Sequence, residues 1–160
     1  MQTNSNITRQ TVDLSGYPDL VVIYLGMKVR KPGGLLTLLR FGPNISKAVA
    51  AKPDGLLAHE PIFYSIFPLH VGMRQYWKDF DTLETWARSL PHQKWWQDFE
   101  RNTGGTSFWH EAYSVRGGME AVYVDVGTPL GFTRFAPVEK PEGSMFSARK
   151  RLHREEKAGS

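Results

Sequence analysis

The sequence has no cysteine, so disulfides, thiolate nucleophiles and cysteine-ligated iron–sulfur or zinc sites are excluded. No apolar run approaches the ~18 residues that a membrane-spanning helix needs. The first residues lack the basic segment and apolar stretch of a signal peptide, so we expect a cytoplasmic protein with no membrane partner. The five histidines show no HExxH spacing, and a zinc or non-haem iron site would have to be assembled from distant positions.

The length of 160 residues, with 41% apolar and 22% charged residues, favours one folded domain. The net charge of +4 indicates no partner by itself. A basic segment at Ser147–Lys157 could contact nucleic acid, but no recognised nucleic-acid motif accompanies it. We therefore expect a solvated, partly helical tail and no nucleic-acid partner.

Aromatic side chains are abundant, with 5 Trp, 6 Tyr and 9 Phe. Most of the Trp residues lie between Trp77 and Trp96. Such density is typical of a large apolar core, an interface or an aromatic-walled pocket.

The spacing of apolar residues predicts both strands and helices. We expect strands at residues 20–29, 57–67, 69–77 and 107–115, and helices at 35–51, 81–90 and 92–101. Gly42-Pro43 is expected to break the first helix, and Asp81 to cap the second. The order β-α-β-β-α-β predicts an α+β fold, namely a ferredoxin-like antiparallel sheet with its helices on one face.

The expected organisation is a lead-in at residues 1–18, the ferredoxin-like domain at 19–128, and an extension with a charged tail at 129–160. An additional strand is expected at Glu120–Val126. The strands look apolar on both faces, as in Leu20–Val29. Two sheets packed face to face in a homodimer would bury the second face.

Several motifs carry a family resemblance: Tyr76-Trp77 followed by Asp79-Phe80-Asp81, the WARSLPHQKWW stretch, and FWHEAYSVRGGMEAVYVDV with GTPLGF. They resemble dimeric α+β barrel proteins of the antibiotic-biosynthesis-monooxygenase type, and within them the branch that contains the monooxygenase of the fumagillin pathway. The resemblance covers roughly residues 20–132. It implies a dimeric α+β barrel and a monooxygenase-like enzyme that acts on a small hydrophobic molecule, with or without haem.

A more distant resemblance is to haem-containing aldoxime dehydratases, in which a Trp-Ala helix runs into a histidine-containing stretch. Here that stretch reads SLPHQ, with His92 between the two positions where those proteins carry histidine. The resemblance implies haem as cofactor, with His92 as its axial metal ligand and Trp96 and Tyr76 beside it. A partly exposed histidine at a Pro-broken helix junction is the alternative for His92.

Strand alternation places His70, Arg74 and Tyr76 around Gly72 on one face of the third strand. If that face lines the barrel, it offers a base, a cation and a phenol in one cavity; otherwise it is a solvated polar face. On the fourth strand, His110 could face the same cavity as His70, or it could be a hydrogen-bonded structural histidine. The predicted catalytic residues are therefore His70, Arg74 and His110.

Four functions are compatible with this sequence. The first is a monooxygenase-like enzyme, in which a histidine base forms a carbanion or an axial histidine holds haem. The second is a dimer that binds haem or another hydrophobic ligand without turnover. The third is a haem lyase that resembles aldoxime dehydratase, and the fourth is a structural dimer with a filled cavity.

Overall fold

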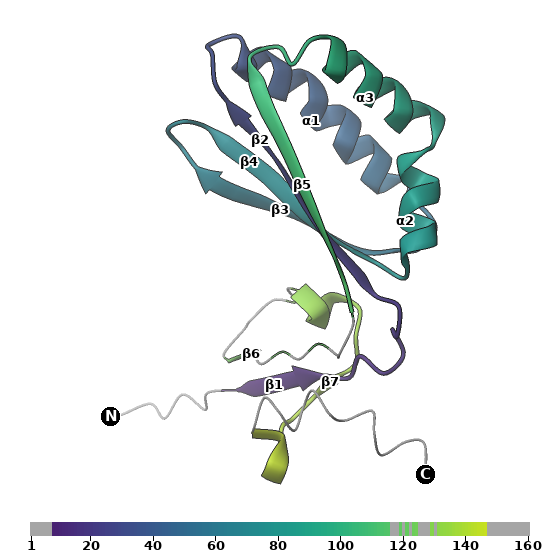
Figure 1. The fold of residues 1–160 in the computed structure, drawn as a ribbon. Helices are drawn as coiled ribbons and strands as arrows, with labels where there is room; N and C mark the ends of the chain where they lie inside the picture. Colours follow the sequence, from purple (N-terminus) through teal and green to yellow (C-terminus); the bar gives the residue numbers. More distant parts are fainter. Residues whose placement is uncertain are drawn as a thin grey trace, which may run out of the picture. The chain divides into compact units, whose positions relative to one another are not determined.

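The computed structural model describes residues 8–115, 119, 121, 123–124, 129 and 131–146. The chain forms two compact units (Figure 1). Residues 19–114 form the sheet–helix unit, whereas residues 1–18 and 115–160 belong to the terminal unit. The domain expected at 19–128 thus extends beyond the end of the sheet–helix unit.

The sheet–helix unit has the predicted ferredoxin-like α+β fold. Its strands are β2 (Val21–Val29), β3 (Leu56–Ser65), β4 (His70–Trp77) and β5 (Thr106–Ser114). Its helices are α1 (Gly34–Ala50), α2 (Phe80–Ala87) and α3 (Leu90–Arg101). The strands are antiparallel in the order β3-β4-β2-β5, and α1 and α3 cover one face of the sheet (Figure 1).

The helices differ from the prediction at Pro43, at both ends of α2 and at the start of α3, since α2 ends at Ala87 and α3 begins at Leu90. Helix α1 continues through Pro43, although this proline removes one helical hydrogen bond. The apolar residues Phe41 and Ile45, on either side of Pro43, both line the space under the helix, and this shared packing holds the two halves in line. Helix α2 is capped by Asp79, whose carboxylate accepts a hydrogen bond from the backbone N–H of Thr82 at 2.7 Å. Asp81 therefore lies inside the first turn, and its predicted role as the cap is wrong.

The core of the sheet–helix unit lies at the end of the sheet next to α2. Val21, Trp77 and Leu83 are buried there, with Trp77 fully inaccessible to solvent. Ile23, Leu56 and Trp86 pack against this cluster. Because Trp77 is the last residue of β4, its burial joins the central strands to α2 and fixes where the helix begins.

The terminal unit contains the strands β1 (Arg9–Val12), β6 (Tyr123–Val124) and β7 (Val138–Glu139), with the short 3-10 helices η1 (Gly131–Arg134) and η2 (Gly143–Phe146). The strands form an antiparallel sheet in the order β6-β1-β7. The hydroxyl of Thr11 donates to the carbonyl of Ala121 at 2.9 Å, and that of Tyr17 donates to the carbonyl of Phe135 at 3.0 Å.

The lead-in contributes a strand to this second sheet. Strand β6 lies within the additional strand expected at Glu120–Val126, and it pairs with β1. The tail at Ser147–Lys157 lies outside the described residues. Across the described part of the chain, no helix is both long enough and apolar enough to cross a membrane.

Candidate functional site

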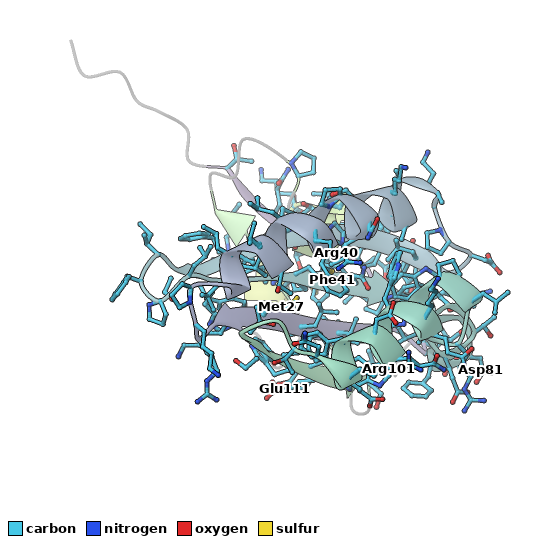
Figure 2. All side chains as sticks on the ribbon, turned by 90° about the horizontal axis from the view of Figure 1, so that it is seen from above. Met27, Arg40, Phe41, Asp81, Arg101 and Glu111 are labelled. Carbon is cyan, nitrogen blue, oxygen red and sulfur yellow. The ribbon has the colours of Figure 1, made fainter. Side chains whose placement is uncertain are left out.

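The four-stranded sheet and the helices of the sheet–helix unit line a partly open cavity of about 280 Å³. This volume lies close to the lower end, roughly 300 Å³, of pockets that hold small molecules. The walls are mainly apolar and aromatic, and they include Leu25, Met27, Phe41, Met73 and Phe99. Figure 2 views α1 and α3 from above and labels Phe41 on α1 and Met27 on β2. Such a cavity is suited to a small hydrophobic molecule.

Strand alternation and helix packing bring these side chains together. Leu25 of β2 is paired with Met73 of β4, so both side chains extend to the same face of the sheet. On α3, Trp96 packs edge-on against Phe108 of β5, with ring centroids 5.2 Å apart. This contact closes the β5 side of the cavity with aromatic rings.

His92 borders the cavity from the first turn of α3. Its Nδ1 lies 3.0 Å from the carbonyl oxygen of Ala87, and a carbonyl can only accept, so Nδ1 carries the proton. The neutral ring then holds its lone pair on Nε2. Burial lowers the pKa of His92, and the bond to the Ala87 carbonyl opposes this shift. The ring packs against Trp86 and Trp95, with centroids 4.6 and 6.2 Å away.

A buried polar relay ends at a second imidazole on the cavity wall. The indole Nε1–H of Trp77 donates to Oε1 of Gln75 at 3.2 Å, and Nε2 of Gln75 lies 3.2 Å from Nδ1 of His59. Gln75 and Trp77 are 1% and 0% exposed, so this relay is shielded from water. His59 itself lines the cavity from β3.

Trp77 is connected to both imidazoles. Through Gln75 it reaches His59 by hydrogen bonds, and through Trp86 it reaches His92 by ring packing. The centroid of Trp86 lies 5.3 Å from that of Trp77. The core residue Trp77 therefore helps to position both histidines of the cavity.

The face of the sheet opposite the helices carries a polar network centred on Arg74. Nε and Nη2 of Arg74 donate to Oε2 of Glu60 at 2.9 and 2.5 Å, and Nη1 donates to the hydroxyl of Tyr24 at 3.2 Å. The guanidinium also lies over the ring of Tyr76 at 5.3 Å. The helices cover the other face of β4, which carries Met73, so Arg74 and Tyr76 do not border the cavity.

His70 lies on this same opposite face, in a cluster of rings. Its Nε2 accepts a hydrogen bond from Nε1 of Trp109 at 2.9 Å, and Tyr64 stacks on it at 4.5 Å. The rings sit over Gly26 and Gly72, where a Cβ atom would meet them at 2.7 to 3.0 Å. Burial lowers the pKa of His70, and the charge of Lys28 lowers it further.

His110 lies on the helix-facing side of β5. It is exposed to solvent and is not one of the residues that line the cavity. Its ring contacts Phe108, with centroids 5.9 Å apart. The neighbouring Glu111 faces the opposite side and accepts a hydrogen bond from Tyr113. The structure therefore does not bring His70 and His110 into one cavity.

Cofactor binding can be tested against the residues that line the cavity. Among the described residues, no group of three or more His, Asp or Glu could hold a metal ion. Haem needs only one protein imidazole, and His92 has the tautomer that leaves Nε2 for iron. Trp96 could form part of the wall of a haem slot. Tyr76 cannot share that slot, because it lies on the opposite face.

His59 is the cavity residue that the sequence reasoning missed. The signal that points to it is Gln75, a polar residue in phase with Val71 and Met73 on an otherwise apolar face of β4. A buried amide needs hydrogen-bonding partners, and His59 stands opposite Gln75 in the sheet register.

The sequence profile of a family described as monooxygenase af470-like matches residues 20–132, which is more than half of the chain. The monooxygenase resemblance expected from the sequence is thus confirmed over the same residues. No curated protein sequence matches the chain.

Two crystal structures of aldoxime dehydratase, one of them OxdRE with butyraldoxime, have TM-scores of 0.69 and 0.70 at 20% and 19% identity. They cover 94% and 95% of this chain, which spans only 46% of theirs. A putative antibiotic biosynthesis monooxygenase from Deinococcus radiodurans matches 61% of this chain and 95% of its own, with a TM-score of 0.49 and 14% identity. The aldoxime dehydratase matches establish a shared fold.

Proposed function

Because the chain belongs to the monooxygenase af470-like family, we propose that it is a monooxygenase-like enzyme acting on a small hydrophobic molecule. The observation that carries this proposal is the apolar cavity with the imidazole of His92 on its wall. The sheet and the helices both contribute to this cavity, so a bound molecule would contact apolar side chains from both layers.

In this proposal His92 acts as the general base. The bond from Nδ1 to the Ala87 carbonyl leaves Nε2 as the proton acceptor, and the lowered pKa keeps the ring neutral near pH 7. The apolar walls protect a carbanion from protonation by water. His92 replaces His70 and His110 as the proposed base because it alone of the three borders the cavity.

The substrate itself supplies the electrons in a reaction without a cofactor. A methylene group next to a carbonyl or aromatic ring loses two hydrogen atoms and gains one oxygen atom. The second atom of O₂ leaves as water, so that R₂CH₂ and O₂ give R₂C=O and H₂O. The protein binds the substrate, accepts the first proton at Nε2 of His92 and excludes water.

Anthrone, a tricyclic ketone with an activated methylene group, is a suitable probe for this reaction. We expect one O₂ to be consumed for each anthrone converted to anthraquinone, above the rate in buffer and without release of hydrogen peroxide. His92→Ala should lower the rate by about 100-fold or more. Gln97→Ala, on the exposed side of α3, should leave it unchanged.

Other outcomes of this assay have clear meanings. An unchanged rate in His92→Ala would exclude His92 as the base. The catalytic roles expected for His70, Arg74 and His110 stay predictions, and their alanine variants test them in the same assay. Saturable binding of anthrone without O₂ consumption would instead identify a carrier of hydrophobic ligands.

A haem protein is the second candidate, and the tautomer of His92 favours it. His92 would be the axial ligand and Trp96 part of the wall, while the haem would supply redox chemistry at its iron. A lyase similar to aldoxime dehydratase would need the same site. Titration with haemin should then give a Soret band that saturates at one haem per chain and shifts in His92→Ala. The absence of a saturable band would exclude haem.

We also propose that the protein is a homodimer that pairs through the sheet face opposite the helices. Tyr64 and Tyr113, on this face, are 38% and 50% exposed. Light scattering on a gel-filtration column should give twice the chain mass of 18.2 kDa, and Tyr113→Arg should lower it. A wild-type mass of one chain would contradict the dimer.

A further inference from the structure

We propose that His59 is a specificity-determining hydrogen-bond donor, whose Nε2–H binds an acceptor oxygen of the ligand in the cavity. Gln75 and Trp77 are positioning residues that hold His59 in this tautomer. The inference deepens the proposed function, and it rests on the use of this cavity for a ligand but on no reaction there.

The indole of Trp77 fixes the orientation of the Gln75 amide. An indole N–H can donate a hydrogen bond but cannot accept one. The atom of Gln75 that lies 3.2 Å from Nε1 of Trp77 must therefore be the carbonyl oxygen. The amide nitrogen then has to face the other way, toward His59.

The amide of Gln75 in turn fixes the tautomer of His59. An amide nitrogen can only donate, so Nδ1 of His59, 3.2 Å from Nε2 of Gln75, must accept. The proton of the neutral imidazole then resides on Nε2. A proton on Nδ1 would set two hydrogen-bond donors against each other in a buried place.

Burial makes this arrangement rigid. Trp77 and Gln75 are almost completely shielded from solvent, so water cannot satisfy the amide if it rotates. Rotation would leave the Trp77 indole without an acceptor, which is costly in the interior. The indole of Trp77 can only donate, so it determines, through Gln75, which nitrogen of His59 carries the proton at the cavity wall.

The two imidazoles of the cavity therefore differ in character. His59 offers a donor through Nε2–H, whereas His92 offers an acceptor at Nε2 because its Nδ1–H is bonded to Ala87. Besides them, the lining residues with a polar side-chain atom are Ser46, which has a hydroxyl group, and Trp86, Trp95 and Trp96, whose indole N–H groups can only donate. The cavity thus favours an apolar molecule with an acceptor oxygen, such as a ketone, over the corresponding hydrocarbon.

The tautomer can be measured on the wild-type protein. Long-range ¹H–¹⁵N correlation spectra distinguish the two neutral tautomers of each histidine from the imidazolium form, and His59→Phe assigns the signals. At pH about 7.5, above the ordinary histidine value, we expect His59 to be protonated on Nε2 and His92 on Nδ1. A His59 ring protonated on Nδ1, or on both nitrogens, would overturn the proposal.

Ligand binding gives the functional test. The probes are 1-tetralone and tetralin, which share a bicyclic skeleton and differ by one carbonyl oxygen, and binding is followed by calorimetry. Wild type should bind 1-tetralone about five-fold more tightly than tetralin, the factor expected for one net hydrogen bond. His59→Phe should remove this preference, whereas Gln97→Ala should keep it.

Gln75→Met tests the positioning role. It preserves the length of the side chain but supplies no amide, so His59 should no longer favour one tautomer in the NMR spectra. The preference for 1-tetralone should fall while the variant retains the circular dichroism spectrum of the wild type. A purely structural role for Gln75 would leave both the tautomer and the preference unchanged, and this result would overturn the positioning role.

The two proposals fail in different ways. A preference for 1-tetralone that depends on His59, together with no O₂ consumption on anthrone, would refute the enzyme but support the donor. Consumption of O₂ without any preference between the probes would support the enzyme and overturn the donor. If neither probe binds, the cavity is not a ligand site for this chemistry and the inference is overturned.

Discussion

The indole of Trp109 on β5 donates a hydrogen bond to His70 on β4 across the strand that separates them. The two nitrogens are 2.9 Å apart, and β2 lies between their strands. The bond passes over Gly26 of β2, where an added Cβ would lie 2.7 Å from the indole nitrogen and 3.0 Å from Nε2 of His70. A residue without a side chain is therefore what allows this cross-strand bond.

Gly26→Ala should lower the free energy of unfolding by about 1–3 kcal/mol, because the methyl group forces the rings of Trp109 and His70 apart. Urea unfolding followed by circular dichroism measures the change. Gly16→Ala is the matched control, since a Cβ at Gly16 meets no atom within 4 Å. The control should change the stability by no more than about 0.5 kcal/mol. Equal effects in both variants would contradict the packing argument.

The free energy of unfolding should fall as the pH drops below about 6.5, which is the ordinary pKa of a histidine side chain. The pKa values of His70 and His92 are lowered in the folded protein, mainly by burial, so the unfolded chain takes up these protons first. The contribution of these two histidines to the free energy of unfolding is therefore complete above about pH 6.5. It is lost as the pH falls toward their lowered pKa values in the folded protein. Unfolding free energies measured from about pH 7.5 to 5.5 check this, and His92→Gln should flatten the curve.

Asp79→Ala should lower the melting temperature more than Asp81→Ala does. Asp79 accepts from the backbone N–H of Thr82, whereas Asp81 lies inside the first turn and caps nothing. Hydrogen bonds from Thr82 lower the pKa of Asp79 below its usual 3.8, so the capping contribution is lost as the pH falls through this lowered value. Equal melting temperatures for the two variants would place the helix start elsewhere.

Glu60→Gln should destabilise the protein by about 1–3 kcal/mol, because Arg74 would keep its charge in a half-buried place without a carboxylate partner. Glu84→Gln is the control, since it breaks the exposed pair of Glu84 on α2 with Arg88, the residue that follows the helix. That change should cost no more than about 0.5 kcal/mol. Chemical denaturation at equal salt concentration measures the loss of stability in both variants. A Glu60→Gln variant as stable as the wild type would contradict a structural role for the pair of Glu60 with Arg74.

The order and type of the elements in the sheet–helix unit follow from local patterns. The apolar, β-branched run LVVIYLGMKV and the spacing of Leu83, Trp86 and Ala87 are properties of neighbouring residues, so they can be read along the chain. The same spacing also included Leu90, which instead begins α3 and is 83% exposed. Strand β1 was missed for the opposite reason. Its four residues show no strong apolar pattern, and they form a strand by pairing with residues more than 100 positions away.

The candidate site could be predicted only in part. Alternation correctly groups His70 with Arg74 and separates both from Met73, but it does not state which group the helices will cover. That choice depends on the packing of α1 and α3, which joins residues from all parts of the unit. The tautomer of His59 depends on contacts across two strands, so it could be derived only from three-dimensional positions.

The pairing of β1 with β6 and β7 also sets an order of events during synthesis. Residues 19–114 form one continuous stretch, and their sheet can assemble as soon as β5 has left the ribosome. Strand β1 is translated before the sheet–helix unit, yet both of its partners come after residue 122. Until then its two edges stay open to other chains, so β1 needs protection while the whole sheet–helix unit is being translated.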